Sequence, residues 1–133
     1  RRRPCHGAGT FDQGADWYGK DTIIENAYIE GGSPIIIYGE RAVIRGCRVK
    51  TTFDHTVKVV WRSDLSKKPL FVLIEDCEIH NGDKTVYAIF IGNAEKVIIK
   101  NNHLKGTGWG ICLNNDPEVN IIDNVINVGA RPI

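Results

Sequence analysis

A short pattern recurs five times along the chain and constrains the fold more than any other feature. Each copy has an apolar residue, two mostly polar or small residues, a small, Asn or Cys residue, a variable residue and a second apolar residue. The copies lie at 24–29, 44–49, 74–79, 99–104 and 121–126. Their first residues are 20, 30, 25 and 22 positions apart, which is too short for βαβ units of about 30 residues with a helix.

A second apolar run follows each of the first four copies, at 35–38, 57–61, 86–91 and 111–113. No stretch has sustained helical periodicity, and β-branched residues dominate the apolar runs. Each repeat therefore predicts a strand, a two-residue corner, a second strand, a loop and a third strand. Such a turn cannot bury its inner face alone, so we expect the turns to stack as a parallel β-helix with strands ~4.8 Å apart.

Stacking in register brings equivalent residues into columns. The first apolar column is Ile24, Ile44, Ile74, Ile99 and Ile121, and the last is Ile29, Val49, Ile79, Leu104 and Ile126. Between them lies the corner column of Ala27, Cys47, Cys77, Asn102 and Asn124. We expect stacked Asn amides to hydrogen-bond along this column. Cys47 and Cys77 are expected to be stacked free thiols, because same-register stacking gives poor disulfide geometry.

The stretch from Gly92 to Asn127 resembles the repeats of right-handed parallel β-helix proteins of the pectin-lyase-like superfamily. The segments that carry the resemblance are Val97-Ile98-Ile99-Lys100-Asn101-Asn102, Gly108-Trp109-Gly110-Ile111-Cys112-Leu113-Asn114-Asn115 and Val119-Asn120-Ile121-Ile122-Asp123-Asn124. The resemblance covers roughly residues 21 to 128 and implies an all-β, single-stranded right-handed parallel β-helix of about five turns. We expect residues 1–20 to form an N-terminal turn and cap, and residues 21–133 to form the repeats of a single domain.

This superfamily includes pectate lyases, polygalacturonases, alginate epimerases and lyases, and phage tailspikes, so the repeat itself does not specify an activity. The paired Asp residues of polygalacturonases are absent, since Asn81-Gly82-Asp83-Lys84 offers only one Asp.

Beyond the corner, side chains that alternate outward form one expected surface patch. Its catalytic candidates are His80, His103, Arg48 and Lys105, and its substrate-binding candidates are Tyr28, Glu30, Lys50 and Glu78. A lyase acting on uronic acids needs a cation to neutralise the carboxylate and a base to take the α-proton, and this patch holds both. The alternative interpretation is an ordinary solvated strand face.

Before the corner, the outward positions are large aliphatic residues, namely Ile23, Val43, Leu73 and Ile98. Such a stripe should not face water, and we expect it to form a homo-oligomer contact. A flanking segment such as residues 1–20, or a part of a longer chain, could cover it instead. At the corner, the charges of Glu25, Arg45, Glu75 and Lys100 alternate in sign and are expected to stabilise the stack.

The composition argues against nucleic acid, a membrane and a metal ion as binding partners. Lys plus Arg is 17 and Asp plus Glu is 16, so no general nucleic-acid binding is expected. No run of about 18 apolar residues is present, so no membrane span is expected. No Cys-x-x-Cys pair occurs, and neither a metal nor another cofactor is expected. The chain lacks Met and begins Arg1-Arg2-Arg3, which suggests a processed chain or part of a longer protein.

The leading functional hypothesis is a β-helix that binds an acidic polysaccharide or acts on it as a lyase, epimerase or hydrolase. The alternative is a non-enzymatic structural or assembly module of a viral spike or surface adhesin. Either hypothesis implies an extracellular or virion-surface location.

Overall fold

The computed structural model describes residues 5–11, 16–17, 21–31, 35–37, 40–51, 55–59, 70–82, 85–92, 94–114 and 118–129. In these residues the chain forms fifteen strands and no helix. Every strand pairing is parallel. Within this part of the chain, accordingly, no helix is long and apolar enough to cross a membrane.

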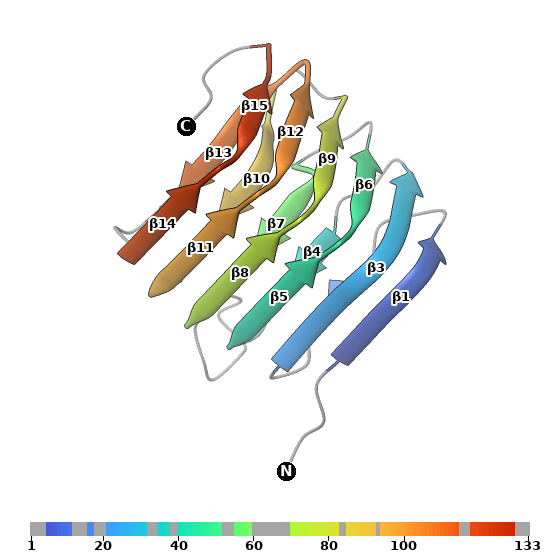
Figure 1. Cartoon of the computed structure of the whole chain (residues 1–133), viewed down its shortest axis with the longest axis vertical. Helices are drawn as coiled ribbons and strands as arrows, with labels where there is room; N and C mark the ends of the chain where they lie inside the picture. The colour runs from blue at the N-terminus through green and yellow to red at the C-terminus, as the bar shows by residue number, and fades with distance from the viewer. Residues whose placement is uncertain are drawn as a thin grey trace.

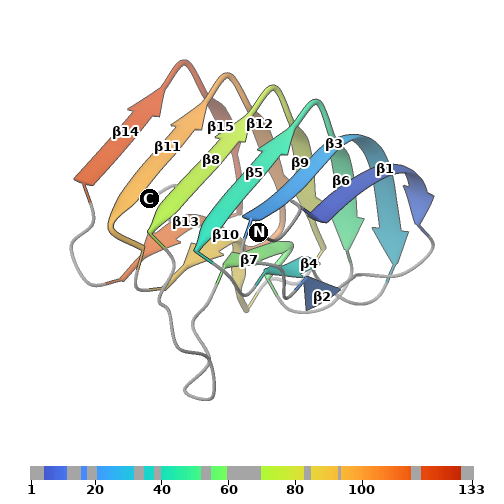
Figure 2. The ribbon, with the colours of Figure 1, turned by 90° about the horizontal axis from the view of Figure 1, so that it is seen from below.

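The strands form three faces of a solenoid (Figures 1 and 2). Face 1 contains the first half of β3 (Asp21–Gly31), β5 (Arg41–Arg45), β8 (Phe71–Glu75), β11 (Lys96–Lys100) and β14 (Glu118–Ile122). Face 2 contains the second half of β3, β6 (Arg48–Thr51), β9 (Glu78–Asn81), β12 (His103–Gly106) and β15 (Val125–Asn127). Face 3 contains β2 (Asp16–Trp17), β4 (Ile35–Ile37), β7 (Val57–Val59), β10 (Tyr87–Ile91) and β13 (Trp109–Leu113). β1 (Cys5–Phe11) pairs with β3 along both halves, with a register shift between Gly7 and Gly9.

The parallel β-solenoid predicted from the repeat is therefore confirmed, with about four turns rather than about five. The fifth repeat does form β14 and β15. The order of face 3 nevertheless ends at β13, so among the described residues this repeat adds no third strand.

The first apolar column forms as predicted, with Ile24, Ile44, Ile74, Ile99 and Ile121 in direct register. The first four are fully buried in one continuous core. Ile121 and Ile126 in the last turn are only partly buried and pack against that core, because β14 and β15 are the outermost strands of their sheet.

The corner between faces 1 and 2 is made by a column of residues with left-handed backbone. Positive φ angles of 52°, 62°, 55°, 55° and 56° occur at Asn26, Gly46, Asp76, Asn101 and Asp123. Gly, Asn and Asp are the residue types that adopt this conformation most readily. One such residue in each repeat turns the chain sharply from face 1 to face 2, and the same turn recurs in every layer.

The next column along the chain ties each corner to the layer before it. Its side chains donate to the carbonyl of the first-column Ile one turn earlier. The donor–acceptor distances are 3.5 Å for Cys47 Sγ to Ile24 O, 3.6 Å for Cys77 Sγ to Ile44 O, 2.9 Å for Asn102 Nδ2 to Ile74 O, and 2.9 Å for Asn124 Nδ2 to Ile99 O. Asn102 Nδ2 also donates to Asn124 Oδ1 at 3.0 Å, so the predicted amide ladder is confirmed. Cys47 and Cys77 are free thiols.

Replacing Asn102 with Ala tests this ladder. Asn102 is 3% exposed. Besides its bond to Ile74 O, its Oδ1 accepts the backbone N–H of Cys77 at 2.9 Å. Each buried group left without a partner costs about 1–3 kcal/mol, so we expect Asn102→Ala to lower the free energy of unfolding by about 2–4 kcal/mol in urea titrations. Asn127→Ala, at an exposed position on β15, is the control and should change it by about 0.5 kcal/mol at most. Equal effects of the two substitutions would contradict a stabilising role for the ladder.

Candidate functional site

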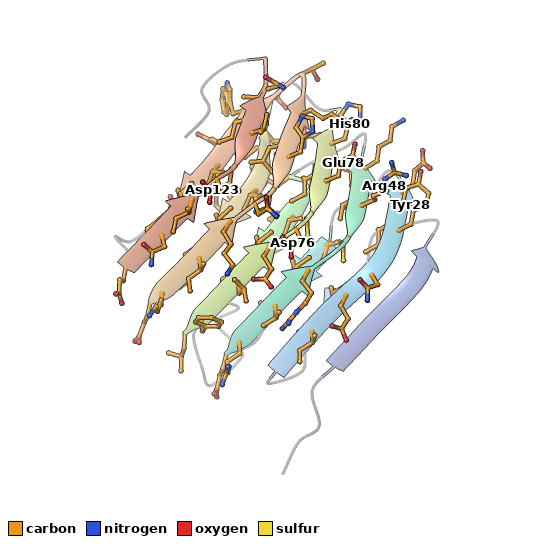
Figure 3. All side chains as sticks on the ribbon, viewed as in Figure 1. Tyr28, Arg48, Asp76, Glu78, His80 and Asp123 are labelled. Carbon is orange, nitrogen blue, oxygen red and sulfur yellow. The ribbon has the colours of Figure 1, made fainter. Side chains whose placement is uncertain are left out.

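All eight residues of the predicted patch lie on face 2, in two rows that follow the strand register. The first row is Tyr28, Arg48, Glu78 and His103, and the second is Glu30, Lys50, His80 and Lys105. Neighbours within a row sit on adjacent strands, which are ~4.8 Å apart. Figure 3 shows Tyr28, Arg48, Glu78 and His80 on the outer side of these strands. The parallel stack therefore converts residues that are 20 to 30 positions apart in the sequence into direct neighbours.

Glu78 joins the two rows through two cations. Its Oε2 lies 3.1 Å from Arg48 Nε, and its Oε1 lies 2.6 Å from Lys105 Nζ. The hydrogen bond from Lys105, followed by that from Arg48, lowers the pKa of Glu78 to about 2. Glu78 is thus ionised at neutral pH and positions the two cations rather than donating a proton.

Tyr28 and Glu30 form a second polar pair at the N-terminal end of the rows. The Tyr28 hydroxyl donates to Glu30 Oε2 at 2.6 Å, and this hydrogen bond is the main reason that the pKa of Tyr28 is raised. Lys50 Nζ lies 3.9 Å from Glu30 Oε1. Tyr28 therefore remains a neutral phenol that is hydrogen-bonded to Glu30.

His80 occupies the middle of the second row, with Lys50 on one side and Lys105 on the other. Burial lowers the pKa of His80, and the charges of Lys50 and Lys105 lower it further, whereas Glu78 opposes them. An imidazole ordinarily titrates near pH 6.5, so His80 is neutral at pH 7. The site therefore places an unprotonated base between two ammonium groups.

The two predicted histidines do not share a cavity. A shallow pocket of about 240 Å³ is lined by Val49 and by six of the eight predicted residues, namely Tyr28, Arg48, Lys50, Glu78, His80 and Lys105. His103 instead lines a groove of about 530 Å³ over the corner. Its Nε2 is shielded from solvent and has no hydrogen-bond partner among the described residues. His80 is the only histidine among the described residues that line the shallow pocket.

Sequence analysis did not single out the oxygen-rich groove over the corner. Asp76, Asn101 and Asp123 line it, and Asn101 Nδ2 donates to Asp76 Oδ1 at 2.6 Å. The presence of Gly46 in the same column as Asn and Asp was a usable signal for this left-handed corner. Among the residues that the structure describes, no group of three or more His, Cys, Asp or Glu side chains could hold a metal ion.

A cluster of aromatic rings on face 3 was also missed. The His55 ring stacks on the Phe90 ring, with 4.5 Å between their centroids. The centroids of the Tyr87 and Trp109 rings lie 4.9 Å apart. The Tyr87 backbone N–H donates to His55 Nδ1 at 2.9 Å. The sequence could not place these rings together, because the register of the third strand depends on loops of different length.

Residues 7–127 match the family model described as "Right handed beta helix region". Neither a curated protein nor a solved structure matches the chain. The match covers both rows of face 2 and identifies no substrate.

The environment of His80 can be measured by NMR titration of its Cε1–H signal. We expect a midpoint below pH 6.5 in the native chain, because burial and two neighbouring cations disfavour the imidazolium. Lys50→Gln should raise the midpoint, because one of the two cations is removed. Lys96→Gln on face 1 makes the same charge change away from His80 and should leave it unchanged. A native midpoint at or above pH 6.5 would contradict this account of the site.

Proposed function

Because the chain belongs to the right-handed β-helix family, we propose that face 2 binds an acidic polysaccharide and removes a proton from a uronic acid residue. The observation that carries this proposal is His80, whose lowered pKa keeps it neutral between Lys50 and Lys105. A neutral imidazole can accept a proton, and cations beside it can hold the carboxylate of the same sugar.

The charge pattern favours an anionic chain over a neutral one. The pocket brings together Arg48, Lys50 and Lys105 against one carboxylate, Glu78. Glu78 is bonded to Arg48 and Lys105, which leaves Lys50, 3.9 Å from Glu30, the less tightly held cation. Lys50 is therefore the group best placed to receive a substrate carboxylate beside His80.

Proton abstraction fits this pocket better than hydrolysis does. Glycoside hydrolysis uses two carboxyl groups, one of which must be protonated to act as an acid. Glu78 has a pKa of about 2 and stays ionised, and Glu30 accepts the hydrogen bond of Tyr28. Glu78, the carboxylate that lines the pocket, is therefore not suited to donate a proton at neutral pH.

The step is a β-elimination. His80 takes the proton from the carbon next to the uronate carboxyl group, and the electrons of that C–H bond form the new C=C bond. The glycosidic C–O bond breaks, and its oxygen leaves with a proton from solvent, which reaches this shallow pocket. The cations stabilise the negative charge that accumulates on the carboxylate as the proton leaves. An epimerase would share the proton abstraction and return a proton to the opposite side of the sugar.

The experiment is incubation with polygalacturonate, alginate and glycosaminoglycans, followed by ultraviolet absorbance of the unsaturated product. We expect His80→Gln to lower product formation by about 10²-fold or more while polysaccharide binding persists. Lys50→Gln combined with Lys105→Gln should weaken binding, and added salt should weaken binding by the native chain. Lys96→Gln with Lys100→Gln removes the same charge from face 1 and is the matched control. The proposal is overturned if the chain forms no product from any of these polymers and binds none of them.

A second candidate function is a non-enzymatic assembly module, for instance in a viral spike or surface adhesin. The observation that favours it is a row of outward aliphatic side chains on face 1, outside the face-2 pocket, namely Ile23, Val43, Leu73 and Ile98. Binding to polysaccharide without any unsaturated or epimerised product would favour this alternative. Either function places the chain where such polymers or surfaces occur, outside the cell or on a virion.

A further inference from the structure

The outer side of face 1 carries a row of four aliphatic side chains in direct register. Ile23, Val43, Leu73 and Ile98 lie on the neighbouring strands β3, β5, β8 and β11, which run side by side in Figure 1. Val43 is 8% exposed, and the other three are partly exposed. The row continues into Asn120 on β14, so the apolar surface is confined to four turns.

Two charged rows border these aliphatic residues. On the corner side the row is Glu25, Arg45, Glu75 and Lys100. On the other side β5, β8 and β11 contribute Arg41, Phe71 and Lys96. Within the chain, Arg45 Nε lies 3.9 Å from Glu25 Oε2, and Lys100 Nζ lies 3.6 Å from Glu75 Oε2. The Arg41 guanidinium lies 5.5 Å from the centroid of the Phe71 ring. On the corner side the sign of the charge therefore alternates from turn to turn.

We propose that face 1 is the interface of a two-fold symmetric dimer, in which two copies of this chain stack face to face. The two-fold axis runs along the strand direction, midway between β5 and β8. This operation places β5 of one copy over β8 of the other, and β3 over β11. The resulting contacts are Val43 with Leu73, Ile23 with Ile98, Arg45 with Glu75, Glu25 with Lys100, and Arg41 with Phe71. Every charged residue in this set faces an opposite charge or an aromatic ring.

Other two-fold arrangements of the same face are worse. An axis along the solenoid would place Arg41 against Arg45 and Lys96 against Lys100. An axis centred on β8 would place Glu75 against itself and Arg45 against Lys100. Like charges brought together across an interface are strongly disfavoured.

Only axes midway between strands bring opposite charges together, because the signs alternate by turn. Of these, an axis between β8 and β11 would place Val43 against Asn120. An axis between β3 and β5 would pair only two of the aliphatic turns with each other. The axis between β5 and β8 is the one that buries all four aliphatic residues against aliphatic partners.

The size of the patch predicts a weak dimer. Stacked sheets pack about 10 Å apart, which lets the aliphatic row close while the bordering side chains pair at the rim. Four strands ~4.8 Å apart and five residues of ~3.3 Å each span about 300 Å² in projection. This is well below the ~800 Å² that each partner contributes to a standard interface. We therefore expect reversible association, with the rim charges selecting orientation rather than supplying most of the affinity.

Sedimentation velocity over a concentration series tests the proposal independently of face 2 and its activity. The native chain should shift from monomer to dimer as its concentration rises to about 1 mM, because small interfaces are weak. Glu25→Lys and Lys100→Glu should each weaken the dimer by about tenfold or more, because each places like charges across the axis. The double variant should recover association, because the reversed charges face each other again.

The double variant separates contacts between copies from contacts within one chain. Inside a chain, positions 25 and 100 are separated by β5 and β8. The double variant places an ammonium at position 25 beside Arg45 and a carboxylate at position 100 beside Glu75, so contacts within one chain predict no recovery. Lys50→Glu makes a charge reversal of the same kind on face 2 and should leave dimerisation unchanged, and circular dichroism checks that each variant folds. A monomer at every concentration, a trimer, or a double variant as monomeric as the single variants would overturn the proposal.

Discussion

Everything else in this molecule depends on the hydrogen-bonded corner that locks each turn onto the one before it. A left-handed residue makes the bend, and the following side chain donates to an Ile carbonyl one turn back. Because a shift of one residue would exchange the inner and outer faces of a strand, a fixed corner also fixes which side chains reach solvent. The register then carries through faces 1 and 2 on either side of it.

That register places outward side chains in rows, so a charged side chain in one turn interacts with the side chains of the adjacent turns ~4.8 Å away. On face 1 the corner-side row avoids repulsion between adjacent turns, because Glu alternates with Arg or Lys. The second row of face 2 departs from alternation at Lys50, His80 and Lys105. A third cation between two lysines would be repelled, whereas a neutral imidazole is tolerated. Burial is the main cause of the lowered pKa of His80, and the strand spacing adds the repulsion of two lysines. Both effects favour the unprotonated imidazole, which is the state a base requires.

The sequence predicted the inner columns and the eight face-2 residues because parallel stacking makes both depend only on the repeat. The amide ladder followed in the same way from Asn102 and Asn124. Other features depend on dimensions that the repeat does not encode. The separation of His80 from His103 depends on how far each side chain lies from the corner, and the aromatic cluster around Tyr87 depends on loop lengths before face 3. The repeat also does not specify how the stack ends: among the described residues the fifth copy contributes β14 and β15 without a strand on face 3.

The donors of the corner column change from thiols to amides along the solenoid. The early turns use thiols at 3.5 and 3.6 Å, which are weak donors. The later turns use amides at 2.9 Å that also bond to each other. In a solenoid each turn is stabilised by its own contacts and those of its nearest neighbours. Ile121 and Ile126 are the least covered members of the inner columns, so hydrophobic burial contributes least in the last turn. The stronger polar ladder lies at that end, where it offsets the missing apolar contacts and keeps β14 and β15 in register with the strands that carry the face-2 site.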